Sequence, residues 1–269
     1  AEINEAILVA RAGGKDVNAL VDQRQQAIDA IAEMVPLREL PRENGTVALI
    51  STGGVMLLDS RPAEIGFSSR AVITSDMTLE NGLLSGLTVD GRPVRTEGTS
   101  NSLGGGSLAA AFAVRDAHAP AVQARLDALA RDLIERFEAP GLDPTAAPGD
   151  PGLFTDAGAA LDPALESGLA GRIAVNAAIL PEAGGELWRL RDGLGAAAQG
   201  EIGQAAQLLA WADAMAAPRT ATSPAFGGAT ASFQGLATDV LSFVGAERRA
   251  AETRQTYATV RRDALREQE

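Results

Sequence analysis

The chain of 269 residues contains no cysteine, one lysine and one histidine. Missing thiols exclude disulfides, thiolate nucleophiles and cysteine-ligated zinc, and the single His118 excludes a metal site built on two imidazoles. Aromatic residues make up only 4% of the chain, so few side chains are available to stack on bases or flat ligands. The net charge of -12 would repel a phosphate backbone, which argues against nucleic acid as a partner.

Long apolar runs are missing as well. No stretch approaches the roughly 20 residues that cross a bilayer, and the N-terminus lacks the basic and then hydrophobic regions of a signal peptide. A hydrophobic content of 46% is nevertheless enough to build a core. The first and last residues read as parts of helices, so we expect a central fragment of a longer protein.

Four segments have apolar residues at helical spacing. The one from Asp16 to Pro36 organises the chain, because its aliphatic face must pack on distant segments. Asp16 is predicted to cap its start and Pro36 to stop it. The other three helices are predicted at 1–12, at 107–137 with Pro120 as a kink or a new start, and at 232–268.

Between the second and third of these segments the hydrophobic period falls to two. Short strands are predicted at 37–40, 47–51, 55–58, 65–67, 71–74 and 87–89. Asn44-Gly45, Gly53-Gly54 and Asp90-Gly91 are typical of the turns between them. Further along, 139–152 is predicted as loop, with short helices at 163–169, 185–191 and 201–216 and a short strand at 173–175.

These elements predict an α+β fold. We expect an elongated antiparallel helical bundle of N-terminal, middle and C-terminal helices with an inserted β-rich module. The predicted helical rod domain is discontinuous, comprising residues 1–39 and 105–269, and the inserted β-rich domain comprises residues 40–104.

Two arginines interrupt apolar seams, and each has an acid nearby in sequence. Arg24 follows Asp22, and Arg115 precedes Asp116. One interpretation is that these pairs make specific ion contacts, which set helix register or meet a neighbouring subunit. The other is that the arginines extend to water at the edge of the apolar stripe. We treat all four as candidate packing or subunit-contact residues.

No motif for catalysis, cofactor binding or metal binding emerges, so we expect no enzymatic activity and no cofactor. His118 is interpreted as an ordinary helix residue. One alternative is a secreted hydrolase that uses carboxylates of the β-rich module, namely Asp59, Glu64, Asp76 and Glu80, although nothing in their spacing pairs them.

Several motifs occur together in one order along the chain. Ile3-Asn4, Gly13-Gly14 and the Asp22-Gln23-Arg24 helix are followed by Asn44-Gly45, Gly53-Gly54 and Gly105-Gly106-Ser107-Leu108, then by Val114-Arg115-Asp116 and a C-terminal helix with Leu236, Val240 and Val244. This order resembles the flagellar hook-associated protein 1 family, over most of the chain, and the Asp-Gln-Arg helix is its most specific part.

The resemblance implies a structural protein of the bacterial flagellum, in a ring at the junction between hook and filament. Its implied partners are copies of itself, the hook protein below, a second junction protein above, and a cytoplasmic export chaperone that grips a C-terminal segment mostly missing here. It also implies export of the unfolded chain without a cleavable signal peptide, and an extracellular location. Another axial protein of the flagellum, from the hook or the distal junction, is a further alternative.

Overall fold

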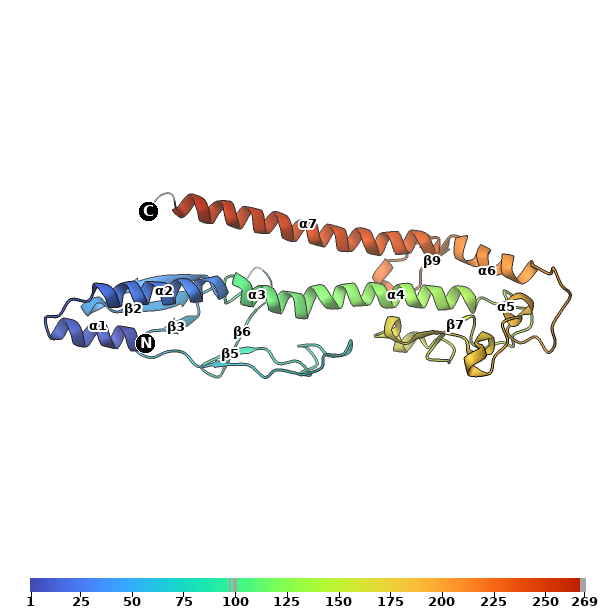
Figure 1. Cartoon of the computed structure of the whole chain (residues 1–269), viewed down its shortest axis with the longest axis horizontal. Helices are drawn as coiled ribbons and strands as arrows, with labels where there is room; N and C mark the ends of the chain where they lie inside the picture. Colours follow the sequence, from blue (N-terminus) through green and yellow to red (C-terminus); the bar gives the residue numbers. More distant parts are fainter. Residues whose placement is uncertain (97, 99–100, 267–269) are drawn as a thin grey trace. The chain divides into compact units, whose positions relative to one another are not determined.

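The computed structural model of the protein describes residues 1–96, 98 and 101–266. The chain divides into two compact units, Ala1–Pro120 and Ala121–Glu269. Both combine helices with small antiparallel sheets, which confirms the prediction of an α+β fold (Figure 1).

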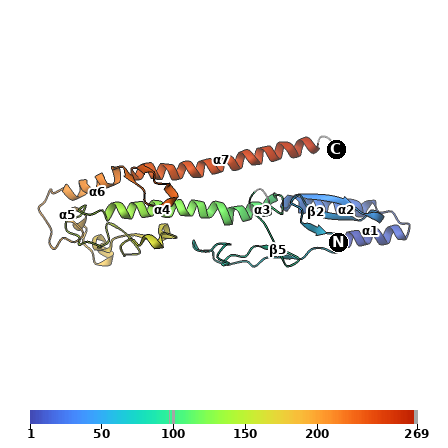
Figure 2. The same ribbon diagram turned by 180° about the vertical axis from the view of Figure 1, so that it is seen from behind.

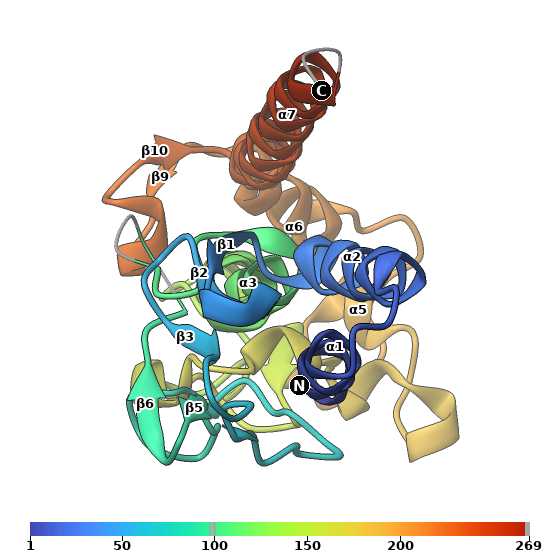
Figure 3. The ribbon, with the colours of Figure 1, turned by 90° about the vertical axis from the view of Figure 1, so that its left-hand side faces the viewer.

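Three helices belong to the first unit: α1 (Glu2–Ala12), α2 (Asn18–Met34) and α3 (Gly106–Ala113). The predicted end of α2 before Pro36 is confirmed, whereas the capping residue at its start is Val17 and not Asp16. The Asp16 carboxylate accepts a hydrogen bond of 3.0 Å from the Asn18 N–H, and Val35 is already extended before Pro36. Seen along the long axis, α1 and α2 lie side by side (Figure 3).

Strands β1 (Leu37–Pro41), β2 (Val47–Ser51) and β3 (Met56–Leu58) form an antiparallel sheet in that order. The sheet packs on α2, where Ile28 contacts Val47 and Leu49 (Figure 2). A second antiparallel sheet contains β4 (Ile65–Gly66), β5 (Leu87–Val89) and β6 (Arg92–Val94). The turns predicted from glycine pairs lie where expected.

The strand predicted at 71–74 is wrong, because those residues lie in the loop between β4 and β5. Val72 is 69% exposed and Ile73 53% exposed. Strand propensity reflects packing on a neighbour, and the structure pairs no strand with this segment. The β-branched residues were therefore not sufficient by themselves to form a strand.

The predicted long middle helix has three parts. After α3 comes a wide π-helical turn, Val114–His118, and then α4 (Ala119–Phe137). Pro120 lies in the first turn of α4, where its missing N–H costs little. Of the two roles predicted for Pro120, the start of a second helix is the one that the structure has.

In the second unit, α4 supports α5 (Arg189–Asp192), α6 (Ala206–Ala216) and α7 (Phe233–Arg266). Leu236 and Val240 of α7 pack with Ala128 of α4 in one core. Phe137, Leu153 and Trp211 belong to another. The remaining strands form two small hairpins: β7 (Phe154–Asp156) with β8 (Ile173–Val175), and β9 (Arg219–Thr220) with β10 (Thr230–Ala231).

Several helix predictions in this unit were too long. The segment 163–169 contains the 3₁₀ turns Pro163–Leu165 and Leu169–Gly171, because Gly168 adopts a φ of 77° between them. The helix predicted at 185–191 begins only at Arg189, and the one predicted at 201–216 begins at Ala206 after Gly203 with a φ of 96°. Helix α7 matches its prediction up to Arg266; the last two predicted helical residues, 267 and 268, lie outside the described residues.

Candidate functional site

The side chain of Asn4 joins helix α1 to the first residue of strand β2. Its Nδ2 donates to the Val47 carbonyl at 2.7 Å, and its Oδ1 accepts from the Val47 N–H at 3.3 Å. An asparagine amide can satisfy both groups of one residue in this way, as a neighbouring strand would. Asn4 is itself buried, so these bonds are shielded from water.

Arg24 of α2 completes this arrangement. Its Nη1 donates to Asn4 Oδ1 at 3.2 Å and to the Gly45 carbonyl at 2.7 Å. The residues Asn4, Arg24, Gly45 and Val47, here called the Asn4 cluster, thus connect two helices with the turn between β1 and β2. Asp22, which neighbours Arg24 in sequence, lies exposed on α2.

Gly45 is favoured mainly by its backbone conformation, and the end of the exposed Arg11 side chain lies close to it. Its φ is 78°, and a Cβ added there would lie 2.3 Å from the guanidinium carbon of Arg11. Any larger residue would have to displace Arg11 and adopt a strained conformation. The Asn-Gly pair that predicted a turn is therefore also part of the contact between this turn and α1.

The second predicted pair lies in the π-helical turn. Arg115 Nε and Nη2 donate to the two oxygens of Asp116 at 2.5 and 2.9 Å. The guanidinium carbon lies 4.8 Å from the ring centre of Phe112 and 5.7 Å from that of Phe67. Arg115 thus combines an ion pair with cation–π contacts that connect α3 to the loop after β4.

Glycines allow the segment before α3 to approach its neighbours closely. A Cβ on Gly53 would lie 2.3 Å from the Asn101 carbonyl oxygen, and one on Gly106 would lie 2.2 Å from the Met34 carbonyl oxygen. The Ser51 hydroxyl donates to the Ser102 carbonyl at 2.6 Å. The glycine pairs quoted in the sequence thus mark where this segment meets β2 and the end of α2.

A buried ion pair lies on α4 in the second unit. Arg136 Nε donates to Asp132 at 2.6 Å, and both side chains are at most 2% exposed. The other guanidinium nitrogens donate to the carbonyl oxygens of Ala214, Ala217 and Ala231. Arg136 therefore holds the end of α6 and strand β10 against α4.

A more exposed network surrounds this pair. Glu135 accepts hydrogen bonds from Arg131, Arg219 and Thr222, while Glu166 accepts from Arg131 and Ser223. Burial acts to raise the pKa of Glu135, but the hydrogen bonds from Thr222 and Arg131 and the two arginine charges outweigh it, so its pKa is lowered. The glutamate is therefore ionised at neutral pH.

Sequence reasoning missed both the buried Asp132–Arg136 pair and the network around it. The signal that could have revealed it is the Asp132-x-x-x-Arg136 spacing, since both residues fall on the apolar face of a predicted helix. Two charges of opposite sign on a buried face, one helical turn apart, can form an ion pair.

Carboxylates also organise the loops after α4. Asp127 accepts from the N–H groups of Gly168 and Ala170, both at 2.8 Å. Asp143 accepts from the Leu194 N–H at 2.7 Å and from Thr145. Asp156 pairs with Arg172 at 2.8 Å. These acids bind protein groups and fix turns.

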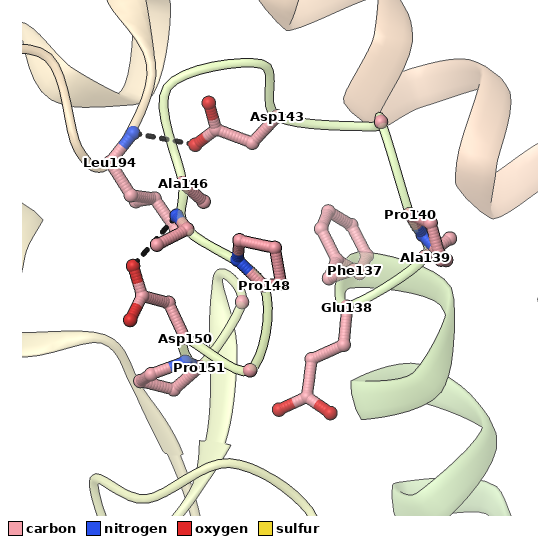
Figure 4. Close-up of a pocket in the computed structure, with 14 residues that line it drawn as sticks. Phe137, Glu138, Ala139, Pro140, Asp143, Ala146, Pro148, Asp150, Pro151 and Leu194 are labelled. Atoms are coloured by element: carbon pink, nitrogen blue, oxygen red, sulfur yellow. Dashed lines mark hydrogen bonds between the residues drawn. The ribbon is translucent and has the colours of Figure 1, made fainter.

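A pocket of about 240 Å³ lies where α4 meets the following loop (Figure 4). Phe137, Pro148 and Pro151 supply apolar walls, and Glu138 and Asp150 supply carboxylates. Burial raises the pKa of Glu138, although the N–H groups of Leu161 and Gly152 act against it. Asp150 accepts from the Ala147 N–H at 2.8 Å and so closes its own loop.

The structure does not gather the acids of the hydrolase alternative at this pocket. Asp59 pairs with Arg42 at 2.9 Å, and Asp76 accepts from the Thr74 hydroxyl at 2.5 Å, which lowers the pKa of Asp76. Both lie exposed in the first unit, as do Glu64 and Glu80. Within the described residues no three side chains of histidine, aspartate or glutamate are placed to hold a metal ion.

Comparison with protein families matches residues 1–151 to the flagellar hook-associated protein FlgK helical domain. This match covers more than half of the 269 residues, so the chain belongs to the FlgK family of structural flagellar proteins.

Comparisons with curated proteins and with solved structures give no match. Among the helices of the described residues, none has both the length and the apolar character to cross a membrane.

Proposed function

We propose that the chain contributes to the ring that joins the flagellar hook to the filament. The observation that carries this proposal is the match of residues 1–151 to the FlgK helical domain. The Asn4 cluster supports it, because a satisfied, partly buried hydrogen-bond network makes this part of the subunit rigid, and a rigid subunit can pack with its neighbours in one arrangement.

The proposed partners are further copies of the chain in the ring, the hook protein below and a second junction protein above. We also propose extracellular location after export of the unfolded chain through the flagellar secretion system, with a cytoplasmic chaperone bound to a C-terminal segment. The lack of cysteine supports this route, because no disulfide has to form or break during export. We propose no catalytic role.

Within the subunit we propose a helical rod of residues 1–39 and 105–269 with residues 40–104 inserted as a β-rich domain. Arg24, Arg115 and Asp116 are proposed to fix internal packing, as their contacts with Asn4, Gly45 and Phe112 indicate. Asp22, exposed on α2, is proposed as the subunit-contact residue of this set.

Deleting the full-length gene tests the proposal. The expected cells carry hooks without filaments and release filament protein into the medium, and the wild-type gene restores swimming. Complementation with Asp22→Ala should weaken filament attachment without changing the thermal stability of the purified chain. Arg38→Ala, at an exposed position of β1, is the matched control. Normal swimming of the deletion strain would rule out the junction role.

A further inference from the structure

Two asparagines in the chain are followed by glycine: Asn44-Gly45 and Asn81-Gly82. In such pairs the backbone nitrogen of glycine can attack the asparagine side-chain amide, because glycine has no Cβ to obstruct the approach. The rate in a folded protein then depends on how firmly the asparagine side chain is held. The structure holds the two side chains very differently.

Asn81 is fixed on both sides of its amide. Its Oδ1 accepts from the Thr78 N–H and the Leu83 N–H, both at 3.1 Å, and its Nδ2 donates to the Asp76 carbonyl at 2.7 Å. The Gly82 N–H donates to the Leu79 carbonyl at 3.2 Å. Attack at Asn81 would require all of these hydrogen bonds to break.

Asn44 lies exposed at the tip of the turn between β1 and β2. In the part of the chain that the structure describes, its side-chain amide makes no hydrogen bond. Its φ is 61°, a left-handed conformation that asparagine tolerates better than most residues but that is still uncommon. The side chain is therefore free to rotate toward the nitrogen of Gly45.

We propose that Asn44 is a site of spontaneous deamidation, and that the reaction releases the Asn4 cluster. The nitrogen of Gly45 forms a bond to Cγ of Asn44, and the side-chain nitrogen leaves as ammonia. Water then opens the five-membered imide at either carbonyl. The net change consumes one water, releases one ammonia, and leaves aspartate or isoaspartate at position 44.

Isoaspartate inserts an extra methylene into the main chain immediately before Gly45. The Gly45 carbonyl is the acceptor for Arg24 at 2.7 Å, and a carbon added at the Gly45 Cα would meet the end of the exposed Arg11 side chain, which would have to move. A main chain lengthened by one carbon at this point moves the Gly45 carbonyl away from its position opposite Arg24. The hydrogen bond of Arg24 to the turn is therefore lost, and the turn separates from α1 and α2.

The experiment is to age the purified chain in mildly alkaline buffer and to quantify isoaspartate at both sites by peptide mapping with mass spectrometry. We expect the product at Asn44 to form several times faster than at Asn81. Ageing in urea is the control, since the two rates should become similar once the structure is lost. Equal rates in the folded chain, or a faster rate at Asn81, would overturn the assignment.

The Asn44→Gly variant tests the consequence. It retains a residue that accepts positive φ but has no amide to lose, so its melting temperature should not change on ageing. The wild-type fraction that carries isoaspartate at position 44 should melt at a lower temperature than fresh protein. An unchanged melting temperature in that fraction would refute the release of the Asn4 cluster.

Discussion

Replacing Arg136 by methionine tests whether α4 holds the second unit together through its buried charges. Methionine keeps much of the length and apolar surface of arginine but removes its five donors. The change leaves the Asp132 carboxylate without its 2.6 Å partner and three backbone carbonyls without a donor. The free energy of unfolding of this unit should therefore decrease.

The structure sets the expected size of the effect. Removing one partner of a buried ion pair costs about 3–5 kcal/mol, because the other charge stays buried. Arg219 Nε lies 3.5 Å from Asp132 Oδ1, too weakly placed to form a hydrogen bond with that oxygen but close enough to offset part of the charge. We therefore expect a loss near 3 kcal/mol, which corresponds to a fall in melting temperature of roughly 6–12 °C.

Thermal unfolding followed by circular dichroism measures this shift. Amide hydrogen exchange should show faster exchange at the end of α6 and in β10, which Arg136 holds through the Ala217 and Ala231 carbonyls. The control is Arg248→Met, which breaks an exposed pair with Glu252 and should change neither measurement. A melting temperature for Arg136→Met equal to that of the control would refute the reasoning, and adding Asp132→Leu should recover part of the loss.

Other predictions concern single contacts. Gly106→Ala should destabilise the first unit by about 1–3 kcal/mol in urea titrations, since its Cβ would meet the Met34 carbonyl oxygen at a φ of 82°. Arg24→Leu should lower the melting temperature by removing a donor to Asn4 and Gly45; an unchanged or higher midpoint would exclude a structural role. Because burial raises the pKa of Glu138, its favourable contribution is present in acid and lost as pH rises through the folded pKa. Glu138→Gln should thus raise the melting temperature at neutral pH and leave it unchanged in acid. The chain alone should sediment as a monomer, and a tight ring would contradict this.

Periodicity and turn residues predicted the elements whose ends are determined locally. Helix α2 stops at a proline, and strand β2 is bounded by two glycine turns, so neither depends on distant partners for its limits. The prediction failed at 71–74, where a β-branched run has no neighbouring strand. It also failed at 201–205, where the φ of Gly203 breaks the helical pattern.

The polar contacts were only partly predictable. Arg24 and Arg115 stood out because each interrupts an apolar seam, but their partners could not be read from spacing. Arg24 donates a hydrogen bond to Asn4, which is 20 residues away, and Arg115 contacts Phe67, which lies in the loop after β4. Such contacts depend on the tertiary fold. A periodic pattern contains no information about which distant segments come together.

The acids of α4 and of the turns that follow it have a consequence for how this unit folds. The Asp127 carboxylate accepts two backbone N–H groups of the turn at 168–170, and Glu138 accepts the Leu161 N–H. The segment 139–205 has few long elements of its own, so a peptide of that sequence should remain a random coil. Side chains of α4 and of the residue that follows it hold the turns of this segment, so we expect those turns to become ordered only once α4 has formed.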